Sequence, residues 1–207
     1  MKGWEQRRDE VLAMARRGHG EPNDLPVLGV DPGVSGGAAL VSANGSELLW
    51  WAHWNKQADD DWWLRWKGHE ESRHSTLEAA VTRAGEELTF STSRPACWRL
   101  VVEELFIHPK KRNAHDLLTL AETAGMCRVA FQGAELHRVL ATVWRHSQLG
   151  LMANTPAPQA EAYALQSAGT AWGDAFPRGR GRRHLAEATF IARHGATCIP
   201  RNFLEQK

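Results

Sequence analysis

The sequence has little cysteine and no hydrophobic run long enough to span a membrane. Its 207 residues include three cysteines, Cys97, Cys127 and Cys198, which are odd in number and far apart in the chain. This pattern is typical of a reducing compartment, and it predicts neither a disulfide framework nor a zinc cluster. Because the segment Met1–Glu10 is polar, no signal peptide is expected and a cytoplasmic location is predicted.

An excess of charge of one sign is also lacking. The formal net charge is +1 at pH 7, so the overall charge does not indicate a nucleic-acid partner. Basic residues nevertheless gather in two clusters, Lys110–Arg112 and Arg178–Arg183. Either cluster could be a solvated loop, but we favour contact with phosphate groups because each lies beside a candidate site residue described below.

The predicted elements follow the order of a mixed α/β sheet. Apolar runs predict five strands: Val27–Val30, Gly36–Val41, Glu47–His53, Trp98–Leu105 and Ala134–Leu140. Helices are expected to begin at Ser75, which opens a capping box, and at Asn113, Thr155 and His184, the last ending at Gly195. Asn44-Gly45 predicts a hairpin, so three antiparallel strands precede the parallel ones. This order is typical of a five-stranded ribonuclease-H-like sheet flanked by helices, whereas dinucleotide-binding folds lack the opening hairpin.

We expect one domain with an extension at each end. Residues 1–26 are predicted to form a helical extension and linker, residues 27–195 the domain, and residues 196–207 a tail. An irregular, charged, tryptophan-rich insertion is expected at about 54–74. Trp62, Trp63 and Trp66 have helical spacing there. Because their acidic neighbours repel DNA, packing or a dimer contact is favoured over stacking on bases.

Acidic residues interrupt three segments that are otherwise apolar. Asp31 ends the first strand, and a buried ionised aspartate costs free energy unless something pairs with it. Glu103 and Glu104 interrupt a later strand, where alternation allows only one of them to face a site, and the residues alone leave that choice open. His184 and Glu187 are spaced to share one face of the last helix.

Convergence of these segments predicts a metal site. Several carboxylates held together repel one another unless cations lie between them. Oxygen ligands with few nitrogens suit Mg²⁺, with Mn²⁺ as a substitute, and two such ions about 3.5–4 Å apart can act on a phosphodiester. The alternatives are a simple turn at Asp31-Pro32-Gly33 and a helix-start role for His184 without a ligand.

The motifs "GVDPGVSGGAA", "VVEELF" and "HLAEATFIA" resemble those of the RuvC family of Holliday-junction resolvases, within the ribonuclease-H-like superfamily. The resemblance runs from Val27 to about Gly195. It implies catalytic and metal-binding roles for Asp31, Glu103, His184 and Glu187. It also selects Glu103 over Glu104, because the family glutamate lies three residues before an aromatic residue, here Phe106.

The resemblance implies a metal-dependent, structure-specific endonuclease that resolves four-way DNA junctions by paired, symmetric hydrolysis. The activity would serve DNA recombination and repair, and the enzyme would be a homodimer. The implied DNA-binding residues are Phe106, Lys110, Lys111, Arg112, Arg145, Arg180, Arg182 and Arg183. Many members carry aspartate where this chain has His184 and Glu187. Such departures are similar to those of phage-borne relatives, for which the location would be the host cytoplasm.

Three rival functions are compatible with the same residues. The substrate could be flaps, other branched DNA or RNA–DNA hybrid. The stretch "DPGVSGG" also resembles the first phosphate loop of actin-like ATPases, but those proteins need a second such loop and usually a longer chain. A non-catalytic junction-binding protein with an altered site is the third alternative, because His184 and Glu187 depart from the common pattern.

Overall fold

The computed structural model describes residues 25–57, 61–69, 71–92, 98–104, 114–133, 135–179 and 182–199, with the side chains of 114–117 left out. Several sequence predictions fall outside these residues. They concern the N-terminal helix within 1–26, Phe106, the cluster Lys110–Arg112, and Arg180.

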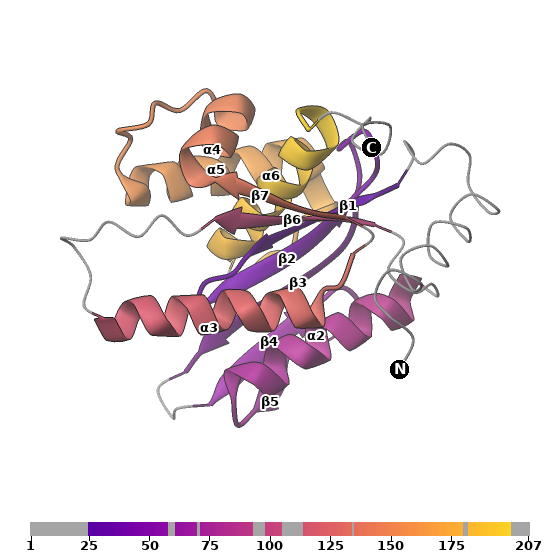
Figure 1. Ribbon diagram of the computed structural model, residues 1–207. Coiled ribbons are helices and arrows are strands. Elements are labelled where there is room, and N and C mark those ends of the chain that lie inside the picture. The colour runs from indigo at the N-terminus through magenta and orange to yellow at the C-terminus, as the bar shows by residue number, and fades with distance from the viewer. Residues whose placement is uncertain are drawn as a thin grey trace, which may run out of the picture.

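A mixed sheet of seven strands forms the centre of the chain (Figure 1), in the order β5-β4-β3-β2-β1-β6-β7. The strands are β1 (Val27–Asp31), β2 (Gly36–Val41), β3 (Leu48–Lys56), β4 (Trp62–Trp66), β5 (Ser72–His74), β6 (Arg99–Glu104) and β7 (Glu135–Leu140). Strands β1 to β5 pair antiparallel, whereas β6 and β7 run parallel to β1. The predicted mixed order is confirmed, but the predicted count of five strands is wrong.

The two additional strands come from the tryptophan-rich insertion, which was expected to be irregular. In β4, Trp62, Leu64 and Trp66 are buried while the residues between them are half-buried. This is the two-residue period of a strand, and not the helical spacing that the tryptophans alone indicated. The buried tryptophans pack into the core with Trp54 of β3, so the predicted packing role agrees with their burial.

Five α-helices flank the sheet within the described residues: α2 (Leu77–Thr92), α3 (Ala114–Ala130), α4 (Ala141–Leu149), α5 (Ala157–Trp172) and α6 (Arg182–Thr197). Figure 1 shows α2 and α3 on one face and α4, α5 and α6 on the other. Helix α4 was not predicted, because it follows β7 directly and Leu140 provides no side-chain cap. No helix among these segments is long and apolar enough to cross a membrane.

Two helix ends differ from prediction. The hydroxyl of Thr76, one residue after the predicted cap, accepts a hydrogen bond from the amide of Ala79 at the start of α2. Helix α6 continues through Gly195, which was expected to end it. A Cβ at Gly195 would lie 2.5 Å from Cγ2 of Val101, so this glycine allows close packing against the sheet instead of ending the helix.

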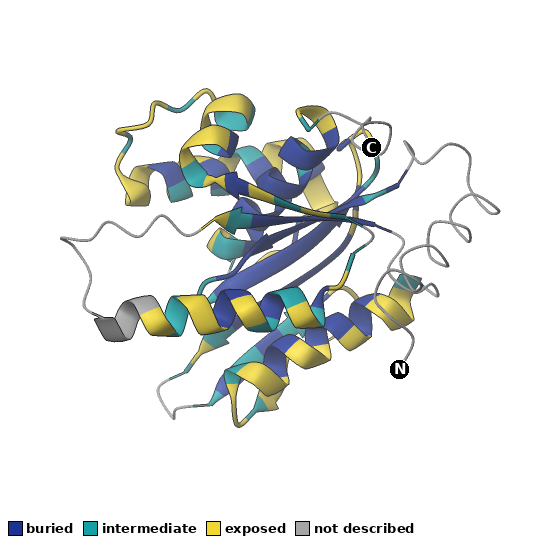
Figure 2. Ribbon diagram, in the orientation of Figure 1, coloured by how far each residue is buried: buried dark blue, intermediate teal, exposed yellow. Residues whose placement is uncertain are grey.

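Alternation along the central strands separates two apolar cores, one on each face of the sheet. Val27 and Val101 belong to the core under α4, α5 and α6, and Leu28 and Val102 to the core under α2 and α3. Figure 2 shows the central strands buried between the two layers of helices. Because side chains alternate between faces, the last residue of β1 lies on the α6 side, as does Glu103 of β6. The sheet therefore directs its acidic strand ends toward α6.

Helix α6 lies in backbone contact with β1. A Cβ at Gly29 would be 2.2 Å from the carbonyl oxygen of Ala188 and 2.3 Å from the amide nitrogen of Ala192. These neighbours are backbone atoms in the middle of a buried helix, so they cannot move aside as a flexible side chain would. Gly29 therefore sets the distance between the sheet and the helix that carries His184 and Glu187.

We predict that Gly29→Ala lowers the free energy of unfolding by at least about 3 kcal/mol, because the added methyl must separate β1 from α6. Gly125→Ala is the control: apart from the backbone of α3 itself, no atom of the described residues lies within 4 Å of a Cβ at this position. Since alanine is the better helix former, that change should stabilise the chain by about 0.5–1 kcal/mol. Urea unfolding of both variants measures the effects, and equal midpoints would contradict the predicted contact.

Candidate functional site

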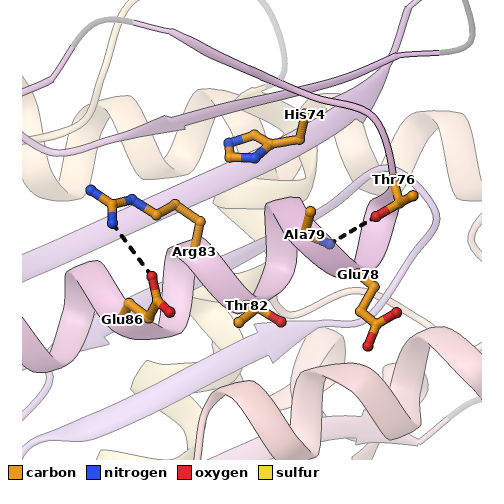
Figure 3. Close-up of a pocket in the computed structure, with 7 residues that line it drawn as sticks. All are labelled: His74, Thr76, Glu78, Ala79, Thr82, Arg83 and Glu86. Carbon is orange, nitrogen blue, oxygen red and sulfur yellow. Dashed lines mark hydrogen bonds and ion pairs between the residues drawn. The ribbon is translucent and has the colours of Figure 1, made fainter.

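One shallow hollow, of about 410 Å³, lies between β5 and α2 (Figure 3) and is lined by His74, Thr76, Glu78, Ala79, Thr82, Arg83 and Glu86. Two of its charged side chains pair with neighbours, since the Arg83 guanidinium contacts both Glu86 and Glu87. Nothing in this hollow brings together metal ligands or a nucleophile and a base. The acidic strand ends beside α6 form the stronger candidate.

Two carboxylates end neighbouring parallel strands. Val30 of β1 pairs with Val102 of β6, so Asp31 and Glu103 are the next residues along the two strands. Asp31 is only 8% exposed and Glu103 is half-buried, whereas Glu104 is exposed on the opposite face. Alternation along the strand allowed only one of Glu103 and Glu104 to face the site, and the sequence residues alone did not say which. In the structure Glu103 faces the site and Glu104 points to the other face.

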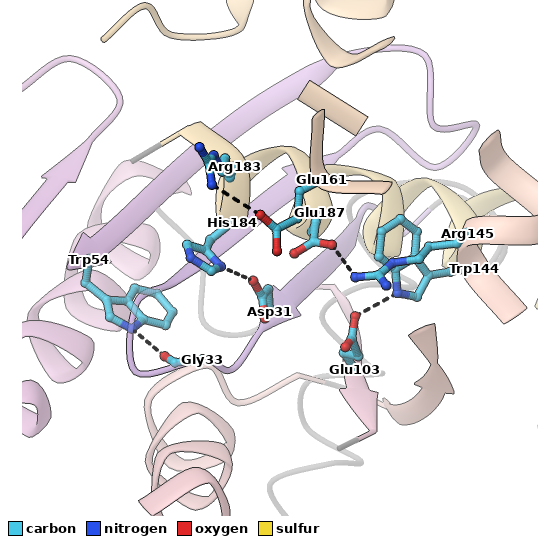
Figure 4. Close-up of polar contacts among 10 residues, drawn as sticks. All are labelled: Asp31, Gly33, Trp54, Glu103, Trp144, Arg145, Glu161, Arg183, His184 and Glu187. Atoms are coloured by element: carbon cyan, nitrogen blue, oxygen red, sulfur yellow. Dashed lines mark hydrogen bonds and ion pairs between the residues drawn. The ribbon is translucent and has the colours of Figure 1, made fainter. Parts of the chain in front are cut away.

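The first turns of α6 bring a histidine and a glutamate over the end of β1 (Figure 4). The Nδ1 atom of His184 lies 2.7 Å from Oδ2 of Asp31, in hydrogen-bond contact. A ligand atom from each of Asp31, His184 and Glu187 lies within 4.8 Å of the others. This close approach needs Gly37 beneath the helix, because a Cβ there would lie 3.0 Å from the His184 carbonyl oxygen.

Helix α4 holds the two glutamates in place. The indole Nε1 of Trp144 donates a hydrogen bond to Oε2 of Glu103 at 2.8 Å, and Nη2 of Arg145 donates to Oε1 of Glu187 at 2.5 Å. Arg145 was predicted to contact DNA, and in the structure it is an ion-pair partner inside the site. Trp144 was not predicted, since only its position beside Arg145 in "VWRHSQLG" pointed to this helix.

A further carboxylate comes from α5 and was also missed. Figure 4 shows Glu161 beside Glu187 and His184, and an oxygen of Glu161 lies 3.4 Å from Nη1 of Arg183. Its charge contributes to raising the pKa of His184. No sequence signal singles it out, because a lone glutamate in "APQAEAYA" is ordinary for a solvated helix face.

Burial and the closeness of the carboxyl groups raise the pKa values of two of them, Glu103 and Glu187. Burial raises the pKa of Glu103 to about 8, and the charges of Asp31 and Glu187 add to the rise. Burial, together with Asp31, raises the pKa of Glu187 to about 7, although Arg145 opposes this. Burial works to lower the pKa of His184, but the hydrogen bond and charge of Asp31 outweigh it, so this pKa is raised overall. Without a bound cation, Glu103 therefore favours its protonated, neutral form near neutral pH, and the charged form of either glutamate lacks full compensation.

These residues fit a divalent metal ion. Carboxylate oxygens with one imidazole nitrogen are suitable ligands for Mg²⁺ or Mn²⁺, and the donor atoms of Asp31, His184 and Glu187 converge within 4.8 Å. Glu103 is outside that group of three but close enough to interact with Asp31 and Glu187. A bound cation would favour the charged form of each carboxylate and so reverse the raised pKa values.

The structure brings together five of the predicted site residues: Asp31, Glu103, Arg145, His184 and Glu187. Arg182 and Arg183 begin α6, and Arg183 is exposed. The remaining predicted DNA-binding residues, Phe106, Lys110, Lys111, Arg112 and Arg180, lie outside the described residues.

No protein-family model matches the chain, and no curated protein matches it. Among solved structures, the chain is similar to the Thermus thermophilus RuvC structure at 18% identity and a TM-score of 0.45, covering 83% of this chain and 93% of that one. It is also similar to T. thermophilus RuvC in complex with Holliday junction substrate, at 18% identity, a TM-score of 0.44 and the same coverage. Likeness of this degree transfers no residue role to this chain.

The raised pKa of Glu103 predicts a pH-dependent stability in the absence of metal. A carboxyl group whose pKa is higher in the folded chain stabilises that state at low pH and loses this contribution as the pH rises through the folded value. For Glu103 the window runs from the usual 4.5 to about 8. Glu103→Gln mimics the protonated acid, so its stability relative to wild type should increase between about pH 5.5 and about pH 8.5.

Urea unfolding in a chelator measures this difference at both ends of the range. Glu104→Gln is the matched control, because Glu104 is exposed on the other face of β6, and its difference from wild type should change little with pH. A stability difference for Glu103→Gln that stays constant across the range would contradict the predicted protonation.

Proposed function

We propose that this chain is a metal-dependent endonuclease that hydrolyses phosphodiester bonds in branched DNA, with the four-way junction as its substrate. The observation that carries the proposal is the convergence of Asp31, His184 and Glu187 within 4.8 Å, beside Glu103. These residues come from the ends of two parallel strands and from the first turns of a helix distant in sequence. Their chemistry is that of a site for hard divalent cations.

Asp31, Glu103, His184 and Glu187 would hold Mg²⁺ or Mn²⁺. When bound, such ions would supply an activated water and charge stabilisation for the phosphate. Asp31 engages Nδ1 of His184, which leaves Nε2 for a cation or a water. Trp144 donates to one oxygen of Glu103 and Arg145 to one oxygen of Glu187, so the second oxygen of each carboxylate would be the one offered to a cation.

The four-way junction is proposed as substrate on the sequence motifs and the basic residues around the site. The motifs that resemble the RuvC family contain the four residues named above. Arg183 is exposed one residue before His184, where a phosphate near the site could reach it. Contacts of Phe106, Lys110–Arg112 and Arg180 with DNA remain predictions from the sequence.

A twofold homodimer completes the proposal. One site cuts one strand, whereas resolving a junction requires two nicks on opposed strands, so two related copies are the simplest source. Helix α3 supports this assembly, because it buries Ala124 and Cys127 toward the sheet while Leu118 and Val129 are 59% and 72% exposed. Its outer side therefore carries apolar surface that a second copy could cover.

We predict that the chain cleaves a synthetic four-way junction in Mg²⁺ and that Asp31→Asn lowers the rate by at least about 100-fold, because metal ligands matter more than the groups that orient them. Junction binding, measured by gel shift, should remain because basic residues supply most of the affinity. Asp174→Asn is the control, since the Asp174 side chain is 95% exposed. Cleavage that is equally fast in Asp31→Asn would remove this residue from the site.

The same assay separates the rival substrates. Linear duplex, a flap and RNA–DNA hybrid of the same sequence serve as competitors. If a flap or the hybrid is cleaved faster than the junction, that nucleic acid is the preferred substrate. Tight junction binding without cleavage in Mg²⁺ or Mn²⁺ would favour a non-catalytic binding protein.

We predict that replacing Arg180, Arg182 and Arg183 together by glutamine weakens junction binding and flattens its salt dependence. The log–log slope should fall by roughly one unit for each phosphate group that the variant no longer neutralises, since each neutralised phosphate releases counterions from DNA. Lys67→Gln with Arg73→Gln is the control, because both positions lie on the β4–β5 side of the sheet. An unchanged slope in the triple variant would show that this segment does not touch DNA.

A further inference from the structure

One row of paired residues runs from the candidate metal site to the additional strand β4. Asp31 of β1 pairs with Gly37 of β2, Gly37 with His53 of β3, and His53 with Arg65 of β4. Residues paired across neighbouring strands project to the same face of a sheet. The row therefore lies on the face covered by α6, with Asp31 and Arg65 at its two ends.

The start of α6 occupies the gap in this row at Gly37. Any Cβ at Gly37 would meet the His184 carbonyl oxygen and the Leu185 Cα at 3.0 Å. His184 contacts Asp31. It also lies near enough to His53 for its charge to act there: burial lowers the pKa of His53 most, followed by the charge of Arg65 and then that of His184. His53 is 4% exposed, and neither of its ring nitrogens has a hydrogen-bond partner among the described residues.

Arg65 contacts the segment that leads into α6. Its Nη1 donates a hydrogen bond to the carbonyl oxygen of Arg178 at 3.0 Å. The next residue, Gly179, has φ +111°, and a Cβ there would lie 3.1 Å from the same Nη1. The Arg65 guanidinium also lies over the Trp51 ring, 5.9 Å from its centre. Strand β4 therefore contacts the chain at Arg178 and Gly179, a short distance in sequence before α6 begins at Arg182.

We propose that Arg65 is a positioning residue that fixes the entry to α6 and thereby sets His184 over Asp31. The inference rests on the proposed function, because the site it positions is the proposed metal site. The Arg65 bond to Arg178 is solvent-exposed, so it adds little to global stability. Its loss would instead let the first turn of α6 shift relative to β1, and metal ligands tolerate such shifts poorly.

The test uses the full chain and four variants. Arg65→Gln removes the charge-assisted bond, and Arg65→Lys keeps a charged donor without the planar guanidinium. Gly179→Ala disturbs the same contact from the side of the loop, because its Cβ would press on Nη1 and its φ disfavours alanine. Arg73→Gln is the matched control: Arg73 on β5 forms an exposed ion pair with Asp61 that does not touch α6.

The first measurement needs neither metal nor DNA. Nitrogen-15 NMR of the histidine rings, assigned with His184→Gln, reports the hydrogen bond between His184 and Asp31. Arg65→Gln and Gly179→Ala should shift the His184 ring signals at one fixed pH, with Arg65→Lys intermediate and Arg73→Gln like wild type. Melting temperatures of Arg65→Gln and Arg73→Gln should stay within about 2 °C of wild type.

The second measurement is Mn²⁺ binding followed by electron paramagnetic resonance. Arg65→Gln should weaken it by about 10-fold or more, as expected for a group that orients a ligand. If wild type binds no Mn²⁺, the proposed function fails, while the NMR comparison still decides the role of Arg65. Unchanged His184 signals in folded Arg65→Gln overturn the positioning role. The same conclusion follows if Arg65→Gln lowers junction affinity while its His184 signals and Mn²⁺ binding stay like those of wild type. Should Arg65→Gln not fold, Gly179→Ala and Arg65→Lys decide the question by the same signals.

Discussion

Helix α6 and strand β1 touch through their backbones, and the candidate site exists because of this contact. Gly29 lies against the backbone of Ala188 and Ala192, and Gly37 lies under His184, so at these two positions no sheet side chain separates the helix from the strands. The first turns of α6 therefore reach the end of β1 closely enough for His184 to bond Asp31. A larger residue at either glycine would move both functional side chains of the helix together.

That closeness carries an electrostatic cost, which the surrounding helices reduce only in part. Burial raises the pKa values of Glu103 and Glu187 to about 8 and about 7, because neither charge is fully compensated. Trp144 and Arg145 of α4 relieve some of the cost, since each donates to one carboxylate. A bound cation would compensate the charged carboxylates and so offset this cost, and polar groups fixed in advance lose little freedom when a ligand arrives.

Local signals predicted the central strands and most helices, because apolar runs and the Asn44-Gly45 turn depend on near neighbours in the chain. They also predicted Asp31, His184 and Glu187 as acidic or polar interruptions of such runs. The strand β4 was missed because the spacing of Trp62, Trp63 and Trp66 fits a helix. The two-residue period of a strand becomes visible only when Leu64 is counted with Trp62 and Trp66. Trp144 and Glu161 were missed for a different reason: no local signal distinguishes either side chain, and only the packing of α4 and α5 on α6 brings them to the site.

The additional strands also change what the sheet presents to other molecules. Without β4 and β5, the nine-residue β3, with three tryptophans, would be the open edge of the sheet. A long apolar edge of that kind is a template for pairing with other chains and for aggregation. The sheet instead ends in β5, which has three residues, all polar or charged. A short polar strand offers few backbone groups to a foreign strand, so the insertion protects the tryptophan-rich half of the sheet from self-association during folding.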